Sequence, residues 1–257
     1  MSWSAAQYTK FEAERNRPIG DLLARIPNIA VATAADIGCG PGNSTELLQA
    51  RFPDAAILGL DRSANMIEAA RQRLPGVHFE IGDIGSWNRP DASLDLILSN
   101  AALQWVPDHA ALLPSLILKL APGGILAVQM PDNLDEPAHR LMREVAEAGP
   151  WSGKLADAAK SRTARHAADW YYRVLRDGAA TVDIWRTTYF HILAGGAGAI
   201  VEWFMGSGLR PYLEPLDADE RAAFLERYEA AIACAYPALP DGTVLLPFPR
   251  LFFIATR

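Results

Sequence analysis

A glycine-rich turn followed by a second acid is the part of this sequence best suited to chemistry. Residues 36–42 read Asp-Ile-Gly-Cys-Gly-Pro-Gly, and Asp61 closes the next apolar run. The glycines permit positive φ angles and let the backbone approach a ligand with no Cβ in the way. In nucleotide-binding βαβ units, an acid at the end of the second strand binds ribose hydroxyls. The pattern therefore indicates a site for a ligand that contains a nucleoside.

The spacing of the glycines separates two classes of ligand. A dinucleotide fingerprint reads G-x-G-x-x-G, whereas this turn reads G-x-G-x-G. Asp36, ahead of the first glycine, would oppose a pyrophosphate but would favour a ligand that carries an ammonium and a sulfonium. D-x-G-x-G-x-G resembles the first motif of the class I S-adenosylmethionine-dependent methyltransferases. An NAD-dependent dehydrogenase is the alternative that this turn leaves open.

Regular elements must hold the turn in place. Apolar runs predict strands at 31–37, 56–60, 77–82, 94–99 and 125–129, the last after a turn at 122–124. Asn43, Ser44 and Thr45 offer N-cap oxygens for a helix after the glycine turn. Strand character resumes at 181–185 and again at 243–246 and 250–255, and helices are expected at 199–206 and 217–236.

These elements and the motif resemblance together predict an α/β protein with the Rossmann-like class I methyltransferase fold. We expect a seven-stranded, mostly parallel sheet with helices on both faces and a helical cap. The chain is expected to form one domain over residues 1–257. Its core would comprise 1–130 and about 180–257, and the cap insertions 131–179 and about 196–240.

Composition narrows the cellular setting. The chain has 257 residues, a net charge of −6 and two cysteines. An acidic protein lacks the basic face that phosphate neutralisation requires, so no nucleic-acid partner is expected. Two cysteines without further ligands nearby indicate a reducing compartment and no metal site. No signal peptide or membrane-length apolar run is visible, so we expect a cytoplasmic protein. No exposed heptad or long apolar edge stands out, so we expect a monomer.

The resemblance to class I methyltransferases implies that the cofactor is S-adenosylmethionine and suggests where it binds. In that superfamily the acid after the third strand, here Asp83, accepts a hydrogen bond from the adenine amino group, and residues after the fourth strand lie beneath the methionine part. The same positions have structural alternatives, because Asp61 and Asp83 could cap turns or helices and Met66 could fill the core. The expected cofactor-binding residues are Tyr8, Arg17, Asp36, Gly38, Gly40, Asp61, Arg62, Met66, Asp83, Ile84, Asn100 and Ala101.

Motifs along the whole chain add a narrower resemblance. They are similar to the trans-aconitate 2-methyltransferase family, which implies formation of a methyl ester on a carboxylate of trans-aconitate. The matching blocks are residues 8–11, 15–18, 36–45, 100–108, 127–133, 182–189, 208–211 and 248–252.

The implied reaction makes few demands on acid and base groups. A carboxylic acid has a pKa of about 4, so its oxygen is ionised at neutral pH and needs no general base. We therefore expect no acid or base catalyst, and His109 is expected to be structural. A tricarboxylate needs arginines, which bind carboxylates through paired N–H donors, although each arginine could instead form a salt bridge that joins the cap to the core. The expected substrate-binding residues are Trp105, Trp185, Arg186, Tyr189, Arg210 and Arg250.

Two other functions are compatible with the same residues. One is a methyltransferase that acts on a different small carboxylate or another small-molecule acceptor. The other is a protein that binds S-adenosylmethionine without catalysis, because a fold alone does not establish chemistry.

Overall fold

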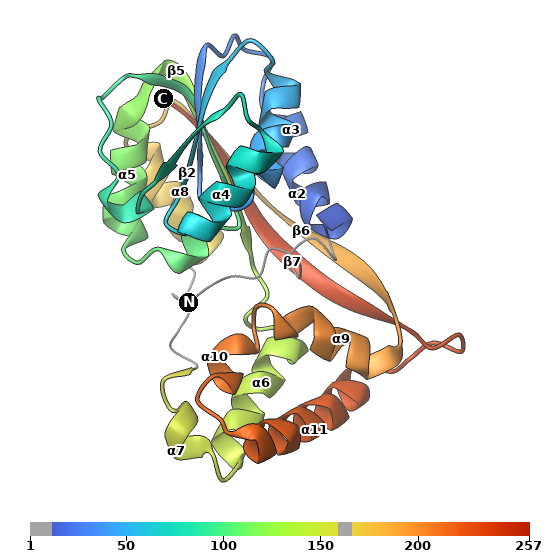
Figure 1. Ribbon diagram of the computed structural model, residues 1–257. Coiled ribbons are helices and arrows are strands. Elements are labelled where there is room, and N and C mark those ends of the chain that lie inside the picture. Colours follow the sequence, from blue (N-terminus) through green and yellow to red (C-terminus); the bar gives the residue numbers. More distant parts are fainter. Residues whose placement is uncertain (1–11, 159–165) are drawn as a thin grey trace. The chain divides into compact units, whose positions relative to one another are not determined.

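The protein is described by a computed structural model that covers residues 12–158 and 166–257 (Figure 1). It divides into two compact units. The first unit consists of the described parts of 1–131, 164–187 and 251–257, and the second of the described parts of 132–163 and 188–250. The chain therefore leaves the first unit twice and returns to it twice.

One sheet with the strand order β3-β2-β1-β4-β5-β7-β6 organises the first unit. Its strands are β1 (Thr33–Ile37), β2 (Ala56–Asp61), β3 (His78–Ile81), β4 (Leu94–Asn100), β5 (Leu120–Pro131), β6 (Thr181–Ala194) and β7 (Thr243–Thr256). The first five strands pair in parallel. The chain order reverses between β1 and β4, which makes the carboxyl ends of these two strands the topological switch point where α/β sheets bind ligands. The α/β fold expected from the sequence is confirmed.

The pairing of β7 with β5 departs from the parallel pattern. Gly123 N–H donates to the Arg257 carbonyl at 2.8 Å, and Arg257 N–H donates to the Gly124 carbonyl at 2.9 Å. Such reciprocal pairs are typical of antiparallel strands. The sheet is therefore mixed, which agrees with the expected mostly parallel sheet.

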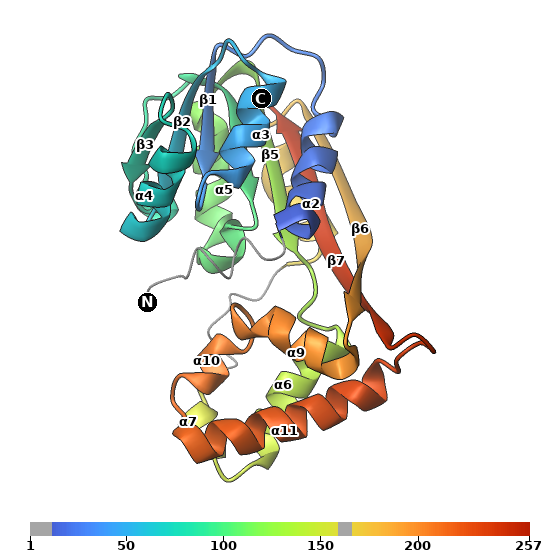
Figure 2. The same cartoon turned by 45° about the vertical axis from the view of Figure 1, so that its right-hand side comes forward.

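Helices cover both faces of this sheet, as Figure 2 shows. On one face lie α2 (Glu12–Arg25), α3 (Asn43–Arg51) and α4 (Ala64–Arg73), and on the other α5 (His109–Lys119) and α8 (Ala168–Arg176). Two 3-10 turns, η1 (Ile84–Ser86) and η2 (Leu103–Trp105), follow β3 and β4. Leu113 and Leu116 of α5 are buried in one apolar cluster with Tyr171 of α8 and Phe253 of β7. The first unit is thus held together by segments from three separate stretches of sequence.

The second unit is mainly helical. It contains α6 (Pro137–Ala148), α7 (Ser152–Leu155), α9 (Gly196–Met205), α10 (Arg210–Leu213) and α11 (Ala218–Ala235). The long helix α11 packs on both α6 and α9. Its Tyr228 hydroxyl donates to the Ala138 carbonyl at 3.0 Å, and Ala138 N–H donates to the Tyr236 hydroxyl at 3.0 Å. Two tyrosines therefore tie α11 to the start of α6.

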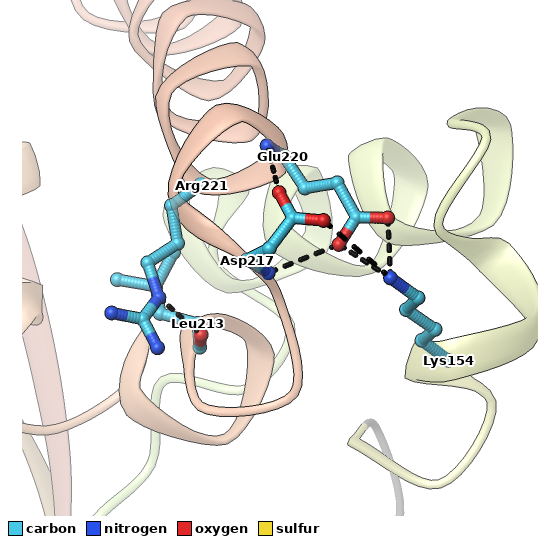
Figure 3. Close-up of polar contacts among 5 residues, drawn as sticks. All are labelled: Lys154, Leu213, Asp217, Glu220 and Arg221. Carbon is cyan, nitrogen blue, oxygen red and sulfur yellow. Dashed lines mark hydrogen bonds and ion pairs between the residues drawn. The ribbon is translucent and has the colours of Figure 1, made fainter.

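Polar contacts fix the beginning of α11 (Figure 3). Asp217 accepts a hydrogen bond from Glu220 N–H at 2.9 Å, and the Glu220 carboxylate accepts one from Asp217 N–H at 3.1 Å. This reciprocal capping box satisfies donors that a helix start would otherwise leave open. Lys154 lies 2.6 Å from Glu220, and Arg221 donates to the Leu213 carbonyl at 2.8 Å. The helices expected at 199–206 and 217–236 are confirmed, and their neighbours α7 and α10 are fastened to the second of them.

Two local expectations were wrong. Helix α8 belongs to the first unit instead of the cap, because Tyr171 and Leu175 fill the core beside α5. Residues 122–124 form no separate turn before the fifth strand but a bulge inside β5, where the register with β4 jumps between Leu94 and Leu96. Strand β6 begins at Thr181 and runs to Ala194, so it contains Tyr189 and His191 as expected. The expectation of a single domain stays a prediction.

Candidate cofactor site

The glycine turn follows β1 at the switch point. Gly38 N–H and Cys39 N–H both donate to the Leu60 carbonyl, at 2.7 and 3.0 Å, which binds the turn to the end of β2. Gly38 has a φ of 81°, and a Cβ built on it would lie 2.1 Å from the Ala102 Cβ. Gly40 has a φ of 54°, but nothing lies within 4 Å of its Cβ position. Gly38 is therefore required by packing, whereas Gly40 leaves open space above the backbone.

Asp36 lies beneath this turn and is fully buried. The Ser44 and Thr45 hydroxyls both donate to its Oδ2 at 2.7 Å. Among the residues that the structure describes, its Oδ1 has no hydrogen-bond partner. Burial raises the pKa of Asp36 to about 6, although the two hydroxyls act in the opposite direction. A buried acid with one open oxygen suits a nearby cationic ligand.

The expected role of Ser44 and Thr45 was wrong. Helix α3 starts after Gly42, whose φ of 92° is left-handed, and no side chain caps its first turn. The hydroxyls instead turn inward to the Asp36 carboxylate, because a hydrogen bond to a charged group contributes more than one to a neutral N–H group. Sequence reasoning therefore missed two residues that support the site.

The raised pKa of Asp36 predicts a pH effect on stability. An acid whose pKa is higher in the folded state stabilises the protein fully below pH 3.8, and this contribution is lost as the pH rises through about 6. A rise from 3.8 to about 6 corresponds to about 3 kcal/mol at a fully buried group. We expect the free energy of unfolding of the parent, relative to Asp36→Asn, to fall by about 2–3 kcal/mol between acidic and neutral pH. Urea unfolding of both proteins at several pH values measures this difference, and parallel pH profiles would contradict it.

Asp61 connects the glycine turn to the chain after β2. Its Oδ2 accepts from Gly40 N–H at 3.0 Å, and its Oδ1 accepts from Ser63 N–H at 2.9 Å. The carboxylate is only partly buried, so it can also accept hydrogen bonds from a ligand. Arg62, the next residue, is exposed, whereas Met66 of α4 is buried.

The third strand ends beside the turn. Asp83 is exposed, and its carboxylate accepts a hydrogen bond from Gly85 N–H at 2.8 Å, so it caps η1. Ile84 Cδ1 lies 3.4 Å from the position that a Cβ on Gly38 would occupy. Ile84 is thus adjacent to the glycine turn, and the turn-capping alternative for Asp83 is observed.

The end of β4 completes this side of the site. Asn100 and Ala101 are half-buried, and Ala101 has a φ of 51°. Trp105 in η2 is also half-buried. His109 is buried, with Nδ1 2.9 Å from the Tyr171 hydroxyl and Nε2 2.8 Å from the Leu103 carbonyl. Burial lowers the pKa of His109, and both ring nitrogens are engaged, so its contacts are structural.

Two further residues expected to bind the cofactor precede β1 in the sequence. Arg17 is exposed on α2. Tyr8 lies outside the residues that the structure describes.

Within the described ranges no cluster of three or more His, Cys, Asp or Glu side chains could hold a metal ion. In those same ranges no helix is long and apolar enough to cross a membrane.

Comparison with known proteins shows the family. The family model described as "Methyltransferase domain" matches residues 34–124. A trans-aconitate 2-methyltransferase from Methylobacterium nodulans is 61% identical over 99% of this chain and 98% of its own length. Another from Methylobacterium radiotolerans is 54% identical, again over 99% of this chain and 98% of its own. The chain belongs to the trans-aconitate 2-methyltransferase family.

Solved structures agree with the fold of this methyltransferase family. The YcgJ protein of Bacillus subtilis matches with a TM-score of 0.63 at 14% identity, covering 94% of this chain and 98% of its own. Phosphoethanolamine N-methyltransferase 2 of Haemonchus contortus, solved with S-adenosylhomocysteine, matches with a TM-score of 0.58 at 15% identity over 94% of this chain and 52% of its own. At such low identities these matches concern the fold alone, and they confirm the class I methyltransferase architecture.

The expected substrate residues of this methyltransferase are divided between the two units. Trp185 and Arg186 belong to the first unit, and Tyr189, Arg210 and Arg250 to the second. Trp185 stacks on Phe252 with ring centroids 5.0 Å apart, and Arg186 is exposed.

In the second unit the three residues differ in exposure. Tyr189 and Arg250 are buried, and the Arg250 guanidinium lies 4.9 Å from the centre of the Phe248 ring. Arg210 donates to the Glu214 carboxylate at 2.6 Å. Arg210 therefore forms a salt bridge with a residue of its own unit, whereas the alternative expected from the sequence was a salt bridge that joins the cap to the core.

Proposed function

We propose that this methyltransferase transfers the methyl group of S-adenosylmethionine to a carboxylate of trans-aconitate and forms a monomethyl ester. The observation that carries the proposal is near-full-length identity of 50–61% with several trans-aconitate 2-methyltransferases. The glycine turn supports it, because the buried open oxygen of Asp36 and the accessible Asp61 carboxylate fit a cofactor with cationic groups and a ribose. A different small carboxylate as the methyl acceptor is less favoured, because these relatives are all named trans-aconitate 2-methyltransferase.

The cofactor supplies a methyl group on a positively charged sulfur, which is activated for transfer without protein chemistry. The acceptor carboxylate is already ionised at neutral pH, so its oxygen can attack while the carbon–sulfur bond breaks, and no proton is transferred. The task of the protein is then to align the reacting groups and exclude water. Such positioning contributes roughly 7–11 kcal/mol to lowering a barrier. His109, whose ring nitrogens are both engaged, is not needed as a base.

The first unit supplies the proposed cofactor contacts. We assign the ribose hydroxyls to Asp61 and the adenine amino group to Asp83, with Met66 and Ile84 packing near the base. Gly38 and Gly40 let the backbone approach, and Asp36 faces the cationic end of the cofactor. The remaining proposed contacts are Tyr8, Arg17, Arg62, Asn100 and Ala101.

Trans-aconitate would be held by arginines, with Trp105, Trp185 and Tyr189 shaping the apolar surroundings. Arg210 must break its salt bridge with Glu214 before it can bind a substrate carboxylate. This lowers the net free energy that Arg210 contributes to substrate binding. Arg250 is buried and needs little further ordering. Arg186 is exposed, and a bidentate contact to a substrate carboxylate would be charge-assisted.

Arg186→Ala is expected to raise the KM for trans-aconitate about 10-fold or more, through loss of a charge-assisted hydrogen bond, and to leave the affinity for S-adenosylhomocysteine unchanged. Arg173→Ala is the matched control, because Arg173 is an exposed arginine paired with Asp169 at 2.7 Å. Steady-state kinetics with varied trans-aconitate measure the effect. Equal KM values in both variants and the parent would remove Arg186 from the site.

The proposed function is tested by incubating the protein with S-adenosylmethionine labelled in the methyl group and with trans-aconitate. We expect a labelled, base-labile monomethyl ester whose position is read by mass spectrometry and NMR. Transfer to another carboxylate at a much higher kcat/KM would change the substrate. Tight binding of S-adenosylhomocysteine without transfer to any acceptor would favour the non-catalytic alternative. A monomeric state, cytoplasmic location and lack of a nucleic-acid partner stay predictions.

A further inference from the structure

Two amide side chains form a hydrogen bond at the end of β4. Asn100 and Gln129 face each other across the β4–β5 ladder, and Gln129 Nε2 donates to Asn100 Oδ1. Gln129 is fully buried, whereas Asn100 is half-buried. An amide that accepts through its oxygen presents its NH₂ group on the other side. In the part of the chain that the structure describes, no group accepts from that NH₂.

The next residue is held in an unfavourable conformation by two glutamines. Ala101, with its φ of 51°, donates its N–H to the Gln129 carbonyl at 2.9 Å, and its own carbonyl accepts from Gln104 Nε2 at 2.6 Å. A left-handed conformation costs an alanine about 1–2 kcal/mol, so the surroundings must impose it. Residues that the surrounding structure holds in a strained backbone conformation occur mainly at ligand sites.

This strained segment meets the glycine turn directly. Ala102 lies so close to Gly38 that a methyl group on the glycine would overlap it. Beside this contact, Ser99 donates its hydroxyl to the Ile37 carbonyl at 3.0 Å, which joins the ends of β1 and β4. The Asn100 NH₂ group therefore stands at the switch point, next to the turn assigned to the cofactor.

We propose that Gln129 is a positioning residue for methyl transfer, which fixes the Asn100 amide so that its NH₂ group donates to an oxygen on the methionine part of the cofactor. The inference rests on the proposed function and adds a residue to it. Without Gln129 the Asn100 amide can rotate and present its oxygen instead, which would repel an acceptor. Gln129 itself does not touch the cofactor.

Two ligands separate positioning from general support of the fold. S-adenosylhomocysteine has the methionine part, whereas methylthioadenosine keeps the adenine and the ribose and lacks the amino-acid group. Gln129→Met removes the hydrogen bond to Asn100 and keeps a side chain of similar volume. We expect it to weaken S-adenosylhomocysteine binding about 3- to 10-fold. Asn100→Asp replaces the donor with an oxygen and is expected to weaken it about 10- to 100-fold. Methylthioadenosine should bind both variants as it binds the parent.

Isothermal titration calorimetry with both ligands decides the matter. Ser99→Ala is the control, because it removes a neighbouring buried hydrogen bond without touching the amide pair. Equal losses for the two ligands in Gln129→Met, or no loss for either, would overturn the proposal. If Gln129→Met does not fold, Asn100→Asp alone tests the proposal. An unchanged affinity of this variant for S-adenosylhomocysteine would show that the Asn100 NH₂ group does not donate to the cofactor, and the proposal would be wrong. A parent protein that binds S-adenosylhomocysteine but forms no ester contradicts the proposed function and leaves the amide pair testable.

Discussion

Gly38→Ala is expected to destabilise the protein by about 2–5 kcal/mol, the sum of left-handed strain at an alanine and overpacking. The new methyl group would lie 2.1 Å from the Ala102 Cβ, at a φ of 81°. Because both groups sit on backbone at the ends of β1 and β4, neither can move without disturbing the sheet. Urea unfolding measures the loss, and cofactor binding should disappear with the fold.

Gly40→Ala provides the matched control in the same turn. Its φ of 54° imposes a similar strain of about 1–2 kcal/mol, but the new methyl group meets nothing within 4 Å. We expect this variant to fold and to bind S-adenosylhomocysteine more weakly, since the methyl group occupies the approach to the turn. Equal losses of stability in the two variants would show that the contact with Ala102 does not matter.

Asp61→Ala is expected to weaken the binding of S-adenosylhomocysteine about 100-fold or more. Each hydrogen bond from a ribose hydroxyl to a carboxylate contributes about 1.5–3 kcal/mol, and two are lost. The substitution also removes the acceptor of Gly40 N–H and Ser63 N–H, which loosens the turn. Calorimetric titration gives the affinity, and methylthioadenosine should lose affinity in parallel because it keeps the ribose.

Asp54→Asn and Asp61→Asn complete this test. Asp54 is exposed beyond α3, so Asp54→Asn makes the same change of charge away from the site. Only Asp61→Asn should weaken binding. If both variants bind as the parent does, the ribose is held by another residue.

Local patterns in the sequence predict the fold well because they follow from backbone chemistry. The strands before Gly38 and Asp61 are short apolar runs, and the glycines are needed by positive φ angles at 38 and 40. The spacing of Asp36 and Asp61 is enough to bring both acids to the glycine turn. The longest helix of the second unit also begins where Asp217 indicates a cap.

Contacts between distant residues could not be predicted in the same way. The partner of Asn100 is Gln129, and their pairing depends on the β4–β5 register, which a bulge shifts. Ser44 and Thr45 are ordinary helix-capping residues by type, and only the buried Asp36 carboxylate explains why they point inward. Arg210 and Glu214 are close in sequence, but their salt bridge depends on the short helix α10, which the sequence analysis did not predict.

The return of the chain to its first unit has a consequence for synthesis on the ribosome. Leu251, Phe253 and Ala255 are buried with Ala35 and Ile37, so one core contains residues that are far apart in the sequence. Nascent chains fold from the N-terminus as they emerge, yet this core stays unfinished until the last strand has been made. The second unit ends at Arg250, so all of it has been made before the end of β7, and it can fold first. A fragment limited to residues 34–124 should accordingly aggregate when expressed alone, despite containing the complete glycine motif.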